Sequence, residues 1–200
     1  MSSPLVQALQ KISYWMENSN SEHAQRIRER MVSEPEYSPQ PGIEREMLEL
    51  YAEEIDFQLS EEVYELYQWH NGMFMIGNSP NPTYFIDFEW GFCEYAEKFR
   101  SFPIFKGDDL WYFIEEISTD RDVSPIYIED GFRFSGRKDD DYSPSITAYM
   151  QAMAECVETY DEISVACSGY SGSRRFELRK LFSIIYAKYG VETRGNVIWR

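Results

Sequence analysis

The sequence contains few residues that could form a disulfide framework or a metal centre. Its three cysteines, Cys93, Cys156 and Cys167, are odd in number and far apart. They match neither a disulfide pattern nor the paired spacing of zinc ligands, and they fit the reducing cytosol. The carboxylates at 139–141 follow Lys138 and lack the alternating oxygen ligands and central glycine of a calcium loop. We therefore expect a cytoplasmic protein without metal or cofactor.

Long apolar runs are also absent. No stretch of about eighteen uninterrupted apolar residues occurs, so we expect no membrane-spanning helix. The first ten residues, MSSPLVQALQ, do not combine a basic segment with a following apolar one, so we expect no secretory signal.

Positive charge is scarce and unevenly placed. Lysine and arginine number 19 against 35 aspartates and glutamates, which gives a net charge of −16. Nucleic acids and anionic membranes select basic surfaces, so neither is an expected partner, whereas a basic protein would meet this chain rapidly. Residues 168–200 carry a net charge of +5, so residues 1–167 carry −21. The simplest interpretation is that the basic segment docks onto the acidic body.

No arrangement typical of a catalytic centre occurs in the sequence. Only His23 accompanies His70, and no serine lies in a Gly-x-Ser-x-Gly turn. Glu115 and Glu116 are adjacent and would point to opposite faces if the strand predicted at 110–114 extends so far, whereas glycosidases need two carboxyls facing across a cleft. The segment 168–173 lacks the Gly-Lys-Ser/Thr ending of a phosphate loop. The sequence therefore predicts no catalytic residue and a protein that is not an enzyme.

Apolar residues recur at helical spacing through much of the chain. Helices are predicted over about 5–16, 22–32, 43–55, 60–70, 144–160 and 174–189. The expected buried face of the third is Met47, Leu50, Tyr51 and Ile55, and that of the last is Phe176, Leu181, Ile184, Ile185 and Tyr189.

Segments rich in aromatic and β-branched residues predict strands over 84–88, 102–105, 110–114 and 124–128. Segment 90–98 fits either a helix or a strand, and 197–199 fits an edge strand. This order predicts an α+β fold with a mainly antiparallel sheet of about four to six strands covered by helices, plus additional N- and C-terminal helices. The predicted parts are an N-terminal helical extension (1–42), an α+β domain (43–165) and a basic helical segment packing on that domain (166–200).

The stretch LSEEVYELYQWHNGMF, residues 59–74, carries clear helix boundary signals. Ser60 is a suitable N-cap, and the glutamates at 61 and 62 suit the positive end of the helix dipole. Asn71 and Gly72 tolerate the left-handed conformation that ends a helix, and His70 in the last turn suits the negative end of the dipole. Trp69, Asn71 and Gly72 are therefore predicted to be structural.

This stretch resembles the Leu-Pro…Asn-Gly helix of the SUKH superfamily, the Smi/Knr-like proteins, with Ser60 in place of the usual proline. Later segments are similar to that family's pattern in the same order: Phe102-Pro103-Ile104-Phe105, Gly107-Asp108-Asp109-Leu110, Ser124-Pro125-Ile126-Tyr127 and Pro144–Met150. The resemblance covers about residues 43–160. It departs from the family where Met73 replaces the usual second glycine.

The resemblance implies an α+β binding module rather than an enzyme. Many bacterial members are implied to be immunity proteins that bind and block a toxin, and fungal relatives resemble regulatory interaction proteins. Together with the charge, this favours an immunity-type protein that binds a basic toxin or effector. The alternative is a regulatory or small-ligand-sensing domain whose aromatic strands wall a pocket.

Acidic turns between the predicted strands are the candidate partner-binding positions. Unpaired carboxylates are costly to bury, so these side chains are expected at the surface. The candidates are Asp108, Asp109, Glu129, Asp130, Asp139, Asp140 and Asp141.

Overall fold

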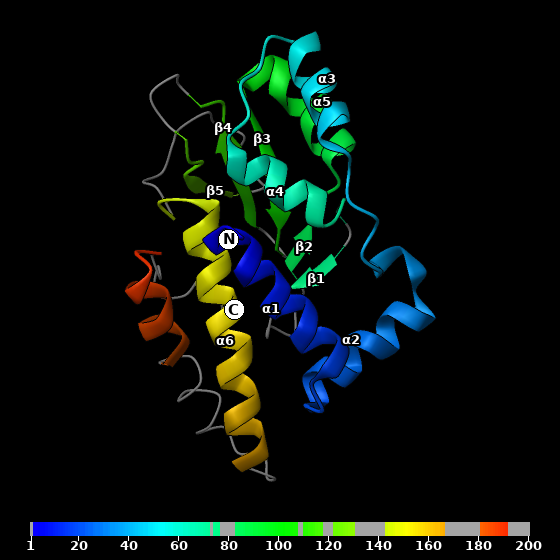
Figure 1. Cartoon of the computed structure of the whole chain (residues 1–200), viewed down its shortest axis with the longest axis vertical. Helices are drawn as coiled ribbons and strands as arrows, with labels where there is room; N and C mark the ends of the chain where they lie inside the picture. The colour runs from blue at the N-terminus through cyan, green and yellow to red at the C-terminus, as the bar shows by residue number, and fades with distance from the viewer. Residues whose placement is uncertain are drawn as a thin grey trace.

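The computed structural model describes residues 2–72, 74–76, 83–107, 110–117, 122–130, 143–166 and 181–191. The chain begins with α1 (Pro4–Asn18), α2 (Glu22–Ser33), the 3₁₀ helix η1 (Pro35–Tyr37), α3 (Arg45–Glu54) and α4 (Glu61–Trp69). It continues with β1 (Phe74–Ile76), β2 (Thr83–Phe85), α5 (Phe88–Phe99), β3 (Ser101–Lys106), β4 (Leu110–Glu115), β5 (Ile126–Asp130) and α6 (Ile146–Ala166). A further helix, unlabelled in Figure 1, covers 181–188. The chain has an α+β fold, as predicted.

The strands form one antiparallel sheet in the order β1-β2-β3-β4-β5, so each strand pairs with its neighbour along the chain. Pro103 pairs with Phe113 whereas Phe105 pairs with Tyr112, which leaves an irregularity in β3 between them. Proline has no N–H to donate to a ladder and is tolerated beside such a bulge. Most boundaries of the predicted strands differ by at most one residue, but β2 ends at Phe85, three residues early, and β5 begins and ends two residues later than predicted. Strand β1 was not predicted.

Helices pack against both faces of the sheet. Side chains alternate along β4, so Tyr112 and Phe113 point to opposite sides. The ring of Tyr112 lies 6.0 Å from that of Tyr149 on α6, and the ring of Phe113 lies 6.0 Å from that of Tyr95 on α5. The contact with α6 therefore lies on one face of β4 and the contact with α5 on the other.

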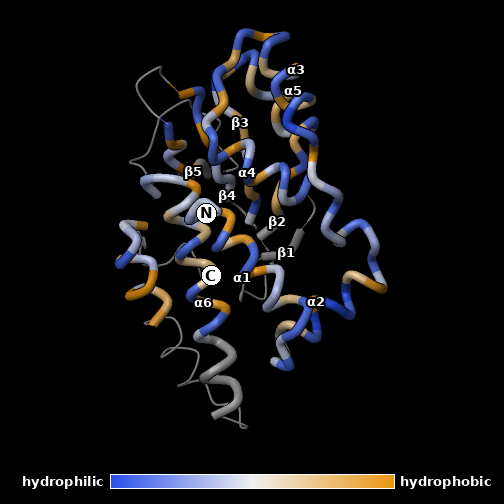
Figure 2. The backbone as a smooth tube through the Cα atoms, viewed as in Figure 1, coloured by the Kyte–Doolittle hydropathy of each residue, from blue (hydrophilic) through white to orange (hydrophobic). Residues whose placement is uncertain are grey.

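Helix α1 belongs to the same core as the sheet. Leu5, Leu9 and Ile12 are buried along one stripe, and α1 contacts α4 and α6 (Figure 1). Figure 2 shows hydrophobic and hydrophilic residues alternating along this helix, as expected where one side is buried. Ser3 caps the helix, because its hydroxyl accepts a hydrogen bond from the N–H of Val6.

Segment 90–98, which fitted two secondary structures, is helical and belongs to α5. The carboxylate of Asp87 accepts a hydrogen bond from the N–H of Trp90 and caps the helix. Phe88 and Phe92 are buried four positions apart and stack with ring centroids 4.7 Å apart. The cap and this spacing explain why an aromatic-rich segment becomes a helix here.

Two predicted buried faces are right only in part. Ile185 is buried, and Tyr51, Ile55, Leu181 and Tyr189 are half-buried against the core. On α3, Leu48 and Ala52 are buried, whereas Met47 and Leu50 are 44% and 58% exposed. The helix over 181–188 buries the residues Phe182, Ile185 and Tyr186, whereas Ile184 is 60% exposed. Both segments carry apolar residues on more than one side, so their spacing alone does not identify the side that meets the core.

Only one basic residue of the segment 168–200, Lys188, lies in the described part of the chain. Its ammonium donates to the carboxylate of Glu155 on α6 at 2.6 Å, and the hydroxyl of Tyr189 donates to the same carboxylate. These bonds hold the pKa of Glu155 below its usual value. A basic residue of this segment thus pairs with an acidic residue of α6, which is the kind of pairing expected if the basic segment docks onto the acidic body. Phe176 and residues 197–199 lie outside the described residues.

Candidate partner-binding surface

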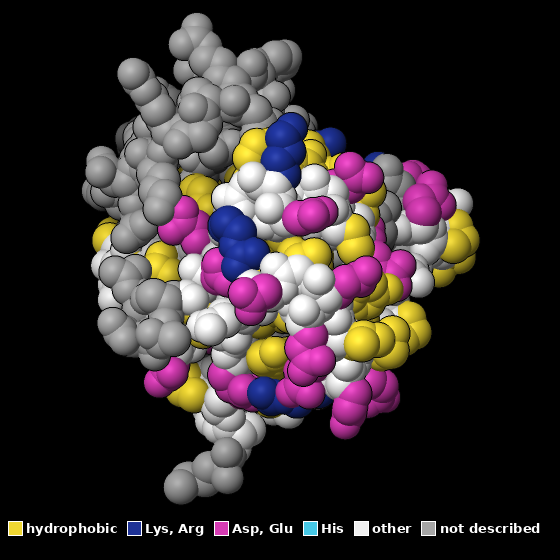
Figure 3. Space-filling model, turned by 90° about the horizontal axis from the view of Figure 1, so that it is seen from above, with side chains coloured by type: hydrophobic (Ala, Val, Ile, Leu, Met, Phe, Trp, Pro, Cys, Tyr) yellow, Lys and Arg dark blue, Asp and Glu magenta, His cyan; other side chains and the backbone are white. Residues whose placement is uncertain are grey.

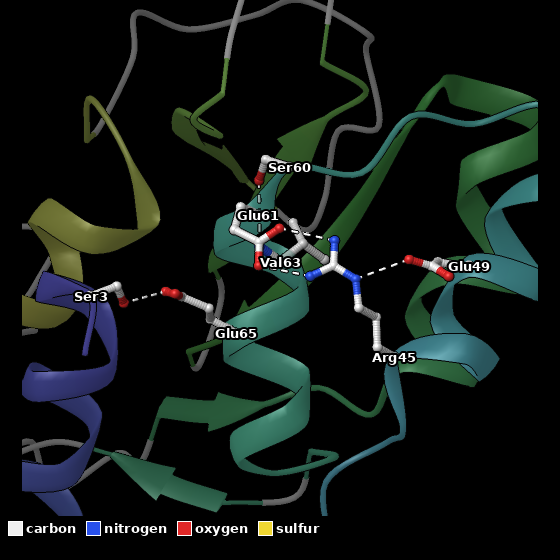
Figure 4. Close-up of polar contacts among 7 residues, drawn as sticks. All are labelled: Ser3, Arg45, Glu49, Ser60, Glu61, Val63 and Glu65. Carbon is white, nitrogen blue, oxygen red and sulfur yellow. Dashed lines mark hydrogen bonds and ion pairs between the residues drawn. The ribbon is translucent and has the colours of Figure 1, made fainter. Parts of the chain in front are cut away.

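The N-terminus of α4 is fixed by a buried serine. The Ser60 hydroxyl accepts a hydrogen bond from the N–H of Val63 at 3.4 Å, so Ser60 is the N-cap (Figure 4). The same hydroxyl lies 2.7 Å from that of Ser124, and both residues are buried. The cap therefore also ties α4 to the segment that enters β5.

Glu62, one residue into α4, is a buried carboxylate with an unexpected role. One of its oxygens accepts hydrogen bonds from the N–H groups of Ser124 at 2.8 Å and Ile146 at 3.3 Å. The other accepts from Thr147 at 2.9 Å. The first N–H groups of a helix have no partner within the helix, so Glu62 satisfies two such donors of α6. Three separate segments are thus joined at one side chain.

Trp69, Asn71 and Gly72 form a corner between α4 and the sheet. The indole N–H of Trp69 donates to the hydroxyl of Ser13 on α1 at 2.8 Å. The Asn71 side-chain oxygen accepts from the N–H of Phe88 at 2.8 Å, at the start of α5. Gly72 is buried with φ of 79°, in the left-handed region. Trp69, Asn71 and Gly72 thus each contact another part of the same chain.

The predicted end of α4 needs one correction. The helix ends at Trp69, and its C-cap His70 is extended, with φ of −151° and ψ of 151°. Gly72 therefore does not terminate the helix, and its left-handed turn instead brings the chain against Asp87. His70 lies outside the last turn.

The imidazole of His70 is expected to titrate below 6.5. Partial burial lowers its pKa from the ordinary 6.5, although the Gln40 carbonyl, 3.2 Å from Nδ1, and the Glu17 carboxylate oppose this effect. A carbonyl only accepts, so Nδ1 carries the hydrogen. Because the folded state holds the proton less tightly than the unfolded state, the stability contributed by neutral His70 is present above pH 6.5 and is lost as the pH falls through the folded pKa.

An NMR titration of the two histidine rings, assigned with a His23→Gln variant, measures this pKa. His70→Gln is expected to flatten the dependence of the free energy of unfolding on pH just below 6.5. A His70 pKa at or above 6.5 would contradict the effect of burial.

Arg45 connects α3 to α4 at the surface. Its guanidinium donates to both carboxylate oxygens of Glu61, at 2.8 and 2.9 Å, and to Glu49 at 2.9 Å (Figure 4). The hydrogen bond with Glu61, followed by that with Glu49, raises the pKa of Arg45 above its ordinary value. The guanidinium also lies 4.2 Å from the centre of the Tyr64 ring. Because the guanidinium is engaged with these carboxylates, it is not a free positive charge on this surface.

The partner-binding positions expected from the sequence fall into two groups. Asp108, Asp109, Asp139, Asp140 and Asp141 lie outside the described residues. Glu129 and Asp130 lie in β5 rather than in a turn, because their backbone pairs with Trp111 and Leu110 of β4. The side chains of Glu129 and Asp130 are likewise outside the description.

The described residues place a different set of carboxylates together, on α3 and α5. Exposed or half-exposed glutamates occupy positions 46, 49, 53 and 54 on α3 and 89, 94 and 97 on α5. The Tyr51 hydroxyl donates to the carboxylate of Glu89 at 2.7 Å and joins the two helices. This bond, together with burial, raises the pKa of Tyr51 to about 12. Figure 3, which views this end of the molecule, shows carboxylate side chains with hydrophobic ones and a few Lys or Arg side chains among them.

A groove of about 770 Å³ lies beside α1, away from these carboxylates. It is lined mostly by polar side chains of α1 and the following turn, with Trp15 and Tyr14 among them, and by Glu158 of α6. Lys11 and Glu158 form an ion pair at 3.1 Å on its wall. The aromatic strands, which were expected to wall any ligand pocket, do not line this groove.

Chemically reactive groups are sparse in the described part of the chain. Within it, no three His, Cys, Asp or Glu side chains are placed to hold a metal ion. None of its helices is both long and apolar enough to cross a membrane. Cys156 is buried, which raises the pKa of its thiol, whereas Cys93 is exposed on α5.

No family model, curated protein or solved structure matches this chain. The candidate site therefore rests on the geometry and charge of its own residues. The acidic surface of α3 and α5 is the clearest concentration of exposed functional groups among the described residues.

Proposed function

We propose that this protein is a non-catalytic binding module that binds and neutralises a basic protein, such as a toxin or effector. The carrying observation is the surface of α3 and α5, where exposed glutamates gather on a chain of net charge −16. Coulombic attraction speeds the encounter of such a surface with a basic partner. The same proposal places the protein in the cytoplasm, with neither nucleic acid nor membrane as partner.

The resemblance to the SUKH superfamily supports this proposal. Residues 59–72 carry its most recognisable motif. There Ser60 and Asn71 form hydrogen bonds with distant segments, and Gly72 lies close to the backbone of Asp87. An antiparallel meander follows this helix, and α6 closes the order. Because its residues form internal contacts, this motif suits a family of binding modules better than a family of enzymes.

Association with the partner is expected to slow as salt is added. Salt screens charges separated by more than about 8 Å at physiological ionic strength, so an electrostatically guided encounter weakens. The partner would be identified by pull-down and its association measured by stopped flow at several salt concentrations. The triple variant Asp139→Asn, Asp140→Asn, Asp141→Asn is expected to associate more slowly and with a flatter salt dependence, while its dissociation rate changes less. An association rate independent of salt in the parent protein would remove the case for a basic partner.

The alternative is a regulatory, small-ligand-sensing domain, and the groove beside α1 is the one observation in its favour. A toxin gene adjacent to the gene for this protein would favour immunity over regulation. A small metabolite that raises the melting temperature, with Tyr14→Ala abolishing the shift, would favour the sensing function.

A further inference from the structure

Half of the large hydrophobic side chains that are exposed in the described part of the chain lie on α3 and α5. Met47 and Leu50 lie on α3, and Trp90 and Phe99 on α5. Exposed apolar side chains scattered singly are ordinary, but a group on two neighbouring helices is typical of an interaction site. Figure 1 shows these helices side by side.

The two helices present the same pattern of side chains. Residues three and seven positions apart on a helix lie on one side of it. On α3 such a stripe consists of Met47, Leu50 and Glu54, and on α5 it consists of Trp90, Cys93 and Glu97. Each stripe therefore carries apolar or thiol groups followed by a carboxylate. We call these six residues, together with Glu89, the α3–α5 face.

Contacts between the helices show that the two stripes are neighbours. Tyr51, one residue after Leu50, donates to Glu89, and its ring lies 5.9 Å from that of Phe88. The pKa of the Cys93 thiol is raised by partial burial and then by the nearby carboxylates of Glu89 and Glu54. Glu54 of α3 is thus close to Cys93 of α5.

We infer that the α3–α5 face is the docking surface for a basic, amphipathic segment of the partner protein. Apolar side chains of the segment pack on Met47, Leu50 and Trp90, and its lysines or arginines pair with Glu54, Glu89 and Glu97. A second copy of this chain does not fit, because it would bring carboxylate against carboxylate. The inference rests on the proposed function, since it names the surface and the chemistry of the partner.

Cys93 provides a direct probe of this surface. In a Cys167→Ser variant, the remaining thiols are the exposed Cys93 and the buried Cys156. The probe ligand is a synthetic helical peptide with lysine on one side and leucine on the other. Two matched peptides replace either every leucine by serine or every lysine by glutamate. The lysine–leucine peptide is expected to slow the reaction of Cys93 with a thiol reagent severalfold, whereas the glutamate peptide leaves the rate unchanged and the serine peptide binds more weakly.

Substitutions on the α3–α5 face test where the lysine–leucine peptide binds. Leu50→Ser is expected to weaken binding of the lysine–leucine peptide about tenfold, as expected for an apolar residue central to an interface. Val32→Ser, which alters a side chain 83% exposed on α2, is the matched control and is expected to have no effect. Glu54→Lys with Glu97→Lys is expected to weaken binding more than Glu29→Lys with Glu36→Lys, which changes the net charge equally. Unfolding curves confirm that each variant is folded.

The results separate the inference from the proposed function. If the peptide or the captured partner binds while Cys93 reacts at its free rate, and Leu50→Ser behaves like Val32→Ser, the α3–α5 face is not the docking surface. In that case the proposed function still stands. If none of the lysine peptides binds, the inference is wrong; if, in addition, association with the captured partner is independent of salt, the proposal of a basic partner fails too.

Discussion

Replacing Gly72 by alanine is expected to lower the free energy of unfolding by about 2–4 kcal/mol, the sum of a backbone cost and an overpacking cost. The backbone cost arises because φ is 79°, a conformation that residues with a Cβ adopt unfavourably. The overpacking cost arises because an added Cβ would lie 2.2 Å from the nitrogen of Asp87 and 2.4 Å from its Cα. These are backbone atoms at the cap of α5, so the clash is relieved only by moving that helix.

Gly190→Ala is the matched control. Gly190 has a similar φ of 74°, but a Cβ there would lie 3.6 Å from the nearest side-chain atom, which is ordinary contact. This variant is expected to lose only the backbone cost, about 1 kcal/mol. Urea unfolding of both variants measures the difference. Equal losses would mean that the approach of Gly72 to Asp87 is not a rigid constraint.

Local signals explain why many elements could be predicted from the sequence. Ser3 and Ser60 are caps whose hydroxyls accept from N–H groups three residues later, and such bonds depend on neighbouring residues alone. The aromatic and β-branched run of β4 has strong strand preference for the same reason. The α+β class and the antiparallel meander then follow from the order of these elements.

Burial on α3 could not be predicted, because it depends on which neighbours the helix meets. Helix α3 carries apolar residues on more than one side, and the spacing of Met47 and Leu50 is as regular as that of Leu48 and Ala52. Only contact with α4 and α5 selects the second stripe as the buried one. The prediction therefore placed in the core two residues that the fold exposes, and these residues carry the further inference.

The acidic surface was missed for a different reason. The sequence predicted partner-binding carboxylates at 108–109, 129–130 and 139–141, because acidic residues are adjacent there and follow predicted strands or turns. The glutamates of α3 and α5 are separated by about forty positions and gather only once the helices pack together. Their density within each helix was a visible signal, since α3 has four glutamates in ten residues.

The hydrogen bonds of Glu62 could not be predicted from the sequence either, although its position in the first turn of α4 was correctly interpreted as favourable. Its hydrogen-bond partners, Ser124 and the first residues of α6, lie 62 to 85 positions away. The spacing of apolar residues along a sequence does not indicate contacts between residues so far apart. A carboxylate that accepts several backbone N–H groups is a strong constraint, because charged acceptors form the stronger hydrogen bonds.

Glu62→Ala is expected to lower the free energy of unfolding by about 3 kcal/mol or more, because three N–H donors at a buried site lose their acceptor. Glu62→Gln is expected to lose less, since its amide oxygen still accepts while its amide nitrogen faces a donor. Glu61→Ala is the control: the neighbouring glutamate forms a surface ion pair with Arg45, worth about 0–1 kcal/mol. Urea unfolding orders the three variants, and hydrogen exchange at Ile146 and Thr147 is expected to accelerate in Glu62→Ala but not in Glu61→Ala. If Glu62→Ala were as mild as Glu61→Ala, with both amides still protected, the start of α6 would be held by other contacts, and Glu62 would not be the residue that joins α4, β5 and α6.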